Sequence, residues 1–103
     1  MHEPSTSPAD LAMSRAALDA LDEALLDLVA RRRAIVEAIF GLKRRHGLPL
    51  IDPEREHALL VARRALAEQR GVPCDLAERL FLVILEGSHA QAREPEATPS
   101  SGS

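Results

Sequence analysis

The feature that most constrains this chain is a single long apolar seam in its N-terminal half. Large apolar residues, and one arginine among them, recur at alternating three- and four-residue spacing: Leu18, Leu21, Leu25, Leu28, Arg32, Ile35, Ile39 and Leu42. This spacing is typical of a coiled-coil-like helix face. Ser7-Pro8-Ala9-Asp10 resembles a helix start and His46-Gly47 a helix end, so the pattern predicts a helix of roughly 35 residues.

A helix of that length is too long for the rest of the chain to cover. At ~1.5 Å per residue it spans ~50 Å. A compact domain of this size is only about 30 Å across. Two shorter helices cannot cover such a seam, but a second copy of the chain can. We therefore predict an intertwined helical homodimer in which the long helices pack together.

The rest of the pattern predicts two shorter helices. Asp52-Pro53 opens the second helix, and Gly71 ends it. Pro73 or Asp75 opens the third. The apolar residues of these two helices are Leu59, Leu60, Leu66, Leu76, Leu80, Phe81, Val83, Ile84 and Leu85. No segment shows the alternation typical of a strand. The predicted fold class is all-α, a three-helix chain with a long first helix.

The ends of the chain and its composition limit the class of protein. Residues 1–7 and 93–103 are polar and are expected to be disordered, which leaves a helical domain at 8–92. The net charge of −3 argues against a nucleic-acid partner. No apolar run approaches the ~18 residues of a membrane span, and no signal peptide is recognisable. Because the single Cys74 cannot form an internal disulfide, we expect a cytoplasmic protein.

Positive charges on the seam helix indicate an anionic ligand. Arg32 lies in the seam between Leu28 and Ile35, where its stem can pack while its head reaches water. Lys43 follows eleven residues later and returns to nearly the same face, whereas Arg15 lies roughly a quarter-turn away from Arg32. Two cations on a face lined by Leu and Ile are energetically costly unless a bound anion balances their charge.

The start of the second helix adds further charged residues. An N-cap and the helix dipole explain Asp52 and Glu54, and could explain Glu56 as well. They do not explain Arg55, because a positive charge is unfavourable at the N-terminal end of a helix. An anion bound beside Arg55 would account for it.

Other catalytic chemistry is sparse. The histidines are scattered, no Cys/His spacing suggests a metal, and no Gly-rich loop suggests a phosphate cradle. Ser88 and His89 are consecutive, so on a helix they would not face each other. The site we expect has cations, a carboxylate and amides, with no nucleophile, metal or cofactor. Such a site suits a reaction that is accelerated by positioning and electrostatic stabilisation.

Several segments together resemble the all-helical, AroQ-type chorismate mutases. Between Leu11 and Gln91 the family pattern is carried by Arg15, LDALDEALLDLVARRRAIVEAI, Lys43, GLPLIDPERE and RLFLVILEGSHAQ. The most specific element is the ordered set Arg15, Arg32, Lys43, Asp52, Arg55, Glu56 and Ser88. The resemblance implies an intertwined dimer with two active sites. It also implies an isomerase that converts chorismate, a dianion, to prephenate in the shikimate pathway of aromatic amino acid biosynthesis.

The resemblance implies a role for each cation of the set. Arg15 would reach into the partner's active site and bind a substrate carboxylate. Arg32 would bind the carboxylate of the enolpyruvyl side chain. Lys43 would donate to the ether oxygen, where negative charge develops as the C–O bond breaks.

The resemblance also assigns the residues around the substrate ring. Glu56 would accept a hydrogen bond from the ring hydroxyl, with Asp52 and Arg55 positioning that end of the pocket. Ser88 would meet the ring carboxylate. The rearrangement is unimolecular and needs no acid, base or cofactor.

The chain departs from the family at one position of the third helix. The family places Gln, or in some members Glu, four residues after the serine, but here that position is Ala92 and the glutamine is Gln91. On a regular helix the two positions differ by ~100°. We favour a local irregularity after Gly87 that lets Gln91 reach the ether oxygen. A site that uses Lys43 alone, or a different substrate, are the alternatives.

Two kinds of alternative function stay open at this stage. The same scaffold and cations serve 4-amino-4-deoxychorismate mutases and isochorismate-pyruvate lyases. A remote alternative is a non-enzymatic helical interaction module, or a nucleic-acid-binding one, that uses the basic clusters Arg31–Arg33 and Lys43–Arg45. The net negative charge and the lack of stacking aromatic residues argue against this last alternative.

Overall fold

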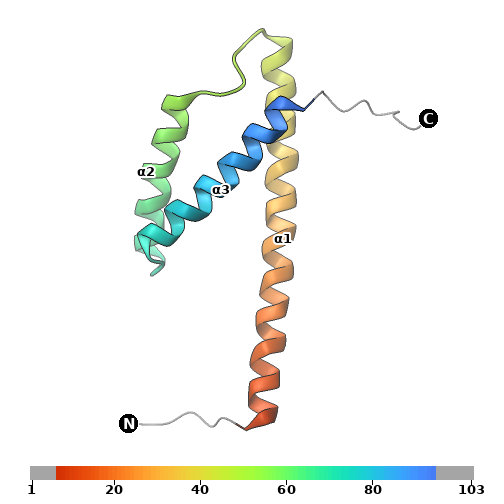
Figure 1. Ribbon diagram of the computed structural model, residues 1–103, viewed down its shortest axis with the longest axis vertical. Helices are drawn as coiled ribbons and strands as arrows, with labels where there is room; N and C mark the ends of the chain where they lie inside the picture. The colour runs from red at the N-terminus through yellow and green to blue at the C-terminus, as the bar shows by residue number, and fades with distance from the viewer. Residues whose placement is uncertain (1–6, 95–103) are drawn as a thin grey trace, which may run out of the picture. The chain divides into compact units, whose positions relative to one another are not determined.

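The chain folds into three α-helices and no strand over residues 7–94, the part that this computed structural model describes. The helices are α1 (Pro8–Arg45), α2 (Pro53–Gln69) and α3 (Cys74–Arg93), as labelled in Figure 1. The predicted all-α class and the long first helix are confirmed. The two predicted tails lie outside the described residues except for Ser7, Arg93 and Glu94, and α3 ends at Arg93, one residue beyond the expected boundary.

The helix ends follow from local sequence chemistry. The Ser7 hydroxyl accepts a hydrogen bond from the Asp10 amide at 3.1 Å, which confirms the predicted start of α1. At the start of α2, Asp52 Oδ1 accepts from the Arg55 amide at 3.2 Å. Positive φ angles at Gly47 (66°) and Gly71 (73°) follow the ends of α1 and α2, where a side chain would strain the backbone.

The chain divides into two compact units, and the first is the part of α1 that ends at Ile35. None of its described residues, 7–35, is buried. The seam leucines of this unit, Leu18, Leu21, Leu25 and Leu28, are between 50% and 66% exposed. Among residues 7–94 no helix is both long and apolar enough to cross a membrane. The first unit therefore carries a continuous apolar face that its own residues do not cover.

The second unit begins at Val36 and contains the last turns of α1 together with α2 and α3. Its buried apolar residues come from all three helices: Phe40, Leu59, Ala67, Ala77 and Leu85. Other apolar residues of α2 and α3, namely Leu66, Leu76, Leu80 and Val83, are between 40% and 63% exposed. A small core thus holds this unit together, and a second apolar surface of α2 and α3 stays at the exterior.

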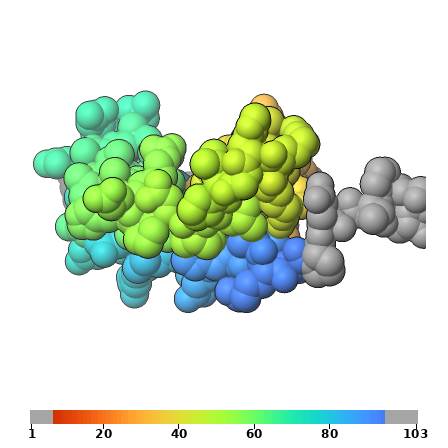
Figure 2. Space-filling model, turned by 90° about the horizontal axis from the view of Figure 1, so that it is seen from above, coloured from red at the N-terminus to blue at the C-terminus, as the bar shows by residue number. Residues whose placement is uncertain are grey.

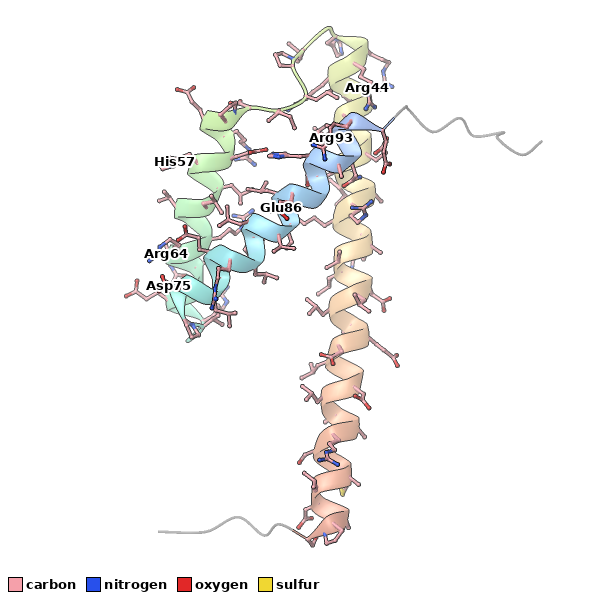
Figure 3. The ribbon with its side chains drawn as sticks, in the orientation of Figure 1. Arg44, His57, Arg64, Asp75, Glu86 and Arg93 are labelled. Carbon is pink, nitrogen blue, oxygen red and sulfur yellow. The ribbon has the colours of Figure 1, made fainter. Side chains whose placement is uncertain are left out.

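An ionic cluster joins the far end of α2 to the start of α3. Arg64 Nη1 donates to Asp75 Oδ1 at 3.1 Å and also to Glu78 Oε1; Figure 3 labels Arg64 and Asp75 side by side. These hydrogen bonds, Asp75 first and Glu78 second, raise the pKa of Arg64 above its ordinary value. The cluster fixes the α2–α3 connection at the end away from the candidate site.

Candidate active site

Lys43 lies two residues before the end of α1, and its hydrogen bonds connect it to the turn that follows. Its Nζ donates to the Leu50 carbonyl at 3.1 Å, and its own carbonyl accepts from the Leu48 amide at 2.8 Å. Both the side chain and the backbone of Lys43 therefore fix the path of this turn. An ammonium group has three N–H donors, so the bond to Leu50 orients Nζ without using its full donor capacity.

A pocket of about 380 Å³ opens beside this lysine. Its lining comes from the end of α1, the turn and the start of α2: Lys43, Leu48, Pro49, Ile51, Asp52 and Pro53. Figure 2 shows this segment in yellow-green, beside the green start of α2 and above the blue end of α3 in that view. The pocket joins a cation to a largely apolar wall, and such a wall strengthens electrostatic interactions with a bound anion.

Asp52 and Arg55 lie together in the first turn of α2. The Asp52 carboxylate caps the helix by accepting from the Arg55 amide, and both residues are exposed. The cap confirms the structural part of the sequence interpretation. The cap uses the backbone amide of Arg55, so its side chain starts at a helix N-terminus, where an anion would stabilise the positive charge.

Glu56 has a partner that the sequence interpretation missed. Glu56 Oε2 lies 2.7 Å from His89 Nε2, and the side chains are 23% and 35% exposed. An ionised carboxylate only accepts hydrogen bonds, so His89 is the donor. The two residues are 33 positions apart and come from α2 and α3. The pair links the first turns of α2 to the last turns of α3, the helix that also carries Ser88.

Ser88 and Gln91 are the two buried polar residues of α3, at 8% and 5% exposure. Ser88 Oγ donates to the Ile84 carbonyl at 3.3 Å, within the helix. Gln91 Nε2 donates to Glu37 Oε1 on α1 at 3.3 Å. Gln91 therefore faces α1 from the same helix that carries Ser88.

The local irregularity that we favoured after Gly87 does not occur. Helix α3 is α-helical without interruption from Cys74 to Arg93. Glycine lowers helix propensity by about 1 kcal/mol relative to alanine, but packing of the buried face of a helix outweighs such a penalty. Gln91 instead reaches Glu37, which lies six residues before Lys43 and so roughly 120° round α1 from it.

Six of the eight predicted site residues lie in the second unit: Lys43, Asp52, Arg55, Glu56, Ser88 and Gln91. The structure brings Lys43 and Asp52 to one pocket, and Glu56 to the residue beside Ser88. Arg15 and Arg32 lie on α1 within the first unit, exposed and half-buried respectively. The grouping of these two arginines with the other six stays a prediction.

Comparison with protein families identifies one match. The model of the family described as chorismate mutase type II matches residues 14–93, which include every predicted site residue.

Comparison with known proteins adds named relatives. The chain is 40% identical over 86 residues to the T-protein of Enterobacter agglomerans, and 39% identical over 80 residues to that of Haemophilus influenzae. These alignments cover 84% and 78% of this chain but only 23% and 21% of the T-proteins, so the chain spans about a fifth of their length.

Two further relatives are matched over most of their own length. One is the chorismate mutase of Methanocaldococcus jannaschii, 27% identical over 82% of this chain and 85% of that protein. The other is the 4-amino-4-deoxychorismate mutase of Streptomyces venezuelae, 35% identical over 78% of each chain.

Proposed function

Because the chain belongs to the chorismate mutase type II family, a family of isomerases, we propose that it rearranges chorismate to prephenate. The observation that carries this proposal is the extent of the family match. It runs from residue 14 to residue 93 and so contains the complete ordered set from Arg15 to Ser88, together with Gln91. A match limited to the apolar seam would have supported the fold alone.

Lys43 is the residue we assign to the ether oxygen. As the C–O bond breaks, negative charge grows on that oxygen, and a donor already in place stabilises it without reorganisation. The hydrogen bond of Nζ to the Leu50 carbonyl supports this role, because it holds the ammonium at the rim of the pocket. Gln91 is the second candidate donor to the same oxygen.

Glu56 is the residue we assign to the ring hydroxyl, with Asp52 and Arg55 fixing that end of the site. The bond between Glu56 and His89 supports the assignment, since it gives the carboxylate a defined orientation. Ser88 precedes His89 in the chain, is buried, and would meet the ring carboxylate.

Arg32 and Arg15 complete the site by binding the substrate carboxylates, and Arg15 does so from a second copy of the chain. The exposed seam of the first unit supports a homodimer. Leu21, for example, is 66% exposed and Ile35 61%, and a second long helix is the natural cover for both. In such a dimer each active site takes an arginine from the partner.

The chemistry asks little else of the protein. A rate gain of ~10⁶ corresponds to about 8 kcal/mol of barrier reduction. Restraint of a flexible dianion in a reactive, chair-like form supplies part of this, and two or three charge-assisted hydrogen bonds in a dry pocket supply much of the rest.

A second candidate is the mutase reaction on 4-amino-4-deoxychorismate. The observation that favours it is the 35% identity to the Streptomyces venezuelae protein of that name, over 78% of each chain. The two substrates differ in one ring substituent, a hydroxyl or an amine, and Glu56 is a suitable partner for either.

The test is to incubate the purified chain separately with chorismate, isochorismate and 4-amino-4-deoxychorismate and to identify each product. We expect prephenate from chorismate as the fastest reaction. Faster turnover of the amino compound would replace the first candidate by the second. Release of pyruvate from isochorismate would indicate a lyase instead. No turnover of any of the three would contradict the assignment of the chain as a mutase.

A further inference from the structure

We infer that His89 is a positioning residue that sets the preference of Glu56 for a ring hydroxyl over a ring amine. The inference rests on the proposed function and deepens it, because it names which substrate the same site prefers. It starts from the 2.7 Å contact between His89 Nε2 and Glu56 Oε2, which links α3 to α2.

The contact uses one of the two carboxylate oxygens. His89 donates to Oε2, so Oε1 is the oxygen best placed to accept from a substrate. The bond also fixes the plane of the carboxylate, because both side chains are only partly exposed, at 23% for Glu56 and 35% for His89. A fixed acceptor costs less ordering when the substrate binds than one that moves freely.

The same contact lowers the charge that Glu56 presents to a ligand. An N–H dipole at Oε2 offsets part of the negative potential of the carboxylate. A neutral hydroxyl needs only an acceptor lone pair. An alkyl amine is protonated near neutral pH, and its attraction to Glu56 depends on the full negative charge. His89 therefore weakens binding of the amine more than binding of the hydroxyl.

One charged neighbour on α2 acts in the same direction. Arg55 precedes Glu56 directly, and its positive charge lies at the same helix end. The acidic residues Asp52 and Glu54 lie at that helix end as well, and Asp52 Oδ1 already accepts from the Arg55 amide. The preference for the ring hydroxyl of chorismate therefore rests on the contact between Glu56 and His89.

The test compares His89→Leu and His89→Gln with the unchanged dimeric protein on chorismate and on 4-amino-4-deoxychorismate. Leucine removes the donor, whereas glutamine keeps a neutral N–H at a similar reach. For His89→Leu we expect the ratio of kcat/KM, amine over hydroxyl, to rise roughly tenfold, the value of one hydrogen bond to a charged group. His89→Gln should restore most of the chorismate activity.

The division between KM and kcat separates this role from a structural one. The ring substituent does not take part in bond making or breaking, so its contact with Glu56 is made equally in the ground state and the transition state. Loss of its positioning therefore raises KM for chorismate and leaves kcat nearly unchanged. If His89 had a merely structural role, its loss would lower the fraction of active enzyme, and kcat would fall equally for both substrates.

His57 is the matched control, since it is the same residue type, adjacent to Glu56 and exposed. His57→Leu should leave the substrate ratio unchanged. An unchanged ratio in His89→Leu as well would overturn the inference while the proposed function stands. A native chain that converts neither compound would overturn both, and this outcome is visible before any variant is made.

Discussion

The two halves of α1 belong to one continuous helix but have different surroundings. Up to Ile35, none of the described residues is buried, and the seam leucines are exposed. After Val36 the helix has partners within its own chain: Phe40 is 5% exposed, and Glu37 accepts a hydrogen bond from Gln91 of α3. The difference shows that one part of the helix is stabilised within its own unit, while the other carries an apolar surface that the described residues of its unit do not cover.

The comparison also divides the candidate chemistry. Lys43, Asp52 and Glu56 lie in the second unit, and each takes part in a hydrogen bond that restrains its position. Arg15 and Arg32 lie in the other part. We expect the first group to be positioned before assembly and the second to be positioned by it.

The largest expected effect comes from a charge placed in the exposed seam. Leu25→Glu should prevent dimer formation and abolish activity, because burial of an unpaired carboxylate is costly and the lost leucine contributes about 2–5 kcal/mol per chain. Sedimentation velocity and circular dichroism at micromolar concentration measure the loss. Ala30→Glu is the control, since it introduces the same group about 140° round the helix from Leu25.

A stable, folded monomer of the native chain in sedimentation velocity would contradict the proposed difference between the two parts of α1. It would show that the residues before Ile35 need no partner, and it would remove the role of Arg15 in a shared site.

The next effect concerns Lys43 in the second unit, where hydrogen bonds within the chain already position the side chain. Lys43→Ala should lower kcat by about 10²–10³ with little change in helix content, since it removes a donor aimed at developing charge. Loss of chorismate absorbance measures the rate. Arg45→Ala, an exposed cation two residues away, is the control. Near-normal turnover by Lys43→Ala would mean that the pocket beside it is not the reaction site.

Features set by local chemistry could be predicted from the sequence. The Ser7 and Asp52 caps and the glycines after α1 and α2 each depend on residues within a few positions of one another, so their patterns are visible in a short window. The all-α class followed from the apolar spacing of three and four residues and from the lack of strand-like alternation.

The contacts that shape the candidate site could not be predicted in the same way. Glu56 and His89 are 33 residues apart, and Glu37 and Gln91 are 54 apart, so no local spacing connects them. Their pairing depends on how α3 packs. The expected irregularity at Gly87 was wrong for a related reason, because helix packing outweighed a local propensity.

A smaller effect tests Gln91, whose side-chain amide donates a hydrogen bond to Glu37. Gln91→Ala should lower kcat/KM by about tenfold to a hundredfold if the amide also reaches the substrate. Ala92→Gln places an amide at the family position, and Glu37→Ala removes the bond to Gln91 while leaving the amide in place. Stopped-flow or absorbance kinetics with thermal melting separates activity from stability.

The outcomes for Gln91 are distinct. Equal losses in Gln91→Ala and Glu37→Ala would show that the amide acts by holding α3 on α1. An unchanged Gln91→Ala together with a faster Ala92→Gln would show that the native site lacks its usual amide.

The smallest expected effect is at the Arg64 cluster, which joins α2 and α3 away from the candidate site. Arg64→Met keeps most of the side-chain stem but removes the hydrogen bonds to Asp75 and Glu78. Exposed ion pairs contribute little to stability, so Tm should fall only slightly, and the fall should shrink further at high salt. Because the hydrogen bonds to Asp75 and Glu78 raise the pKa of Arg64, a rise of pH from neutral removes the contribution of the guanidinium only in strongly alkaline solution.

Two further variants set the scale for the expected fall in the Tm of Arg64→Met. Leu85→Ala removes a buried side chain of the same unit and should cost about 2–5 kcal/mol. A double-mutant cycle of Arg64→Met with Glu78→Gln isolates the ion pair from the lost packing. If Arg64→Met lowered Tm as much as Leu85→Ala, the stability of the second unit would depend on this surface cluster as much as on its apolar core. The contrast between the second unit, with its own core, and the first unit, with its exposed seam, would then be weaker than the burial pattern indicates.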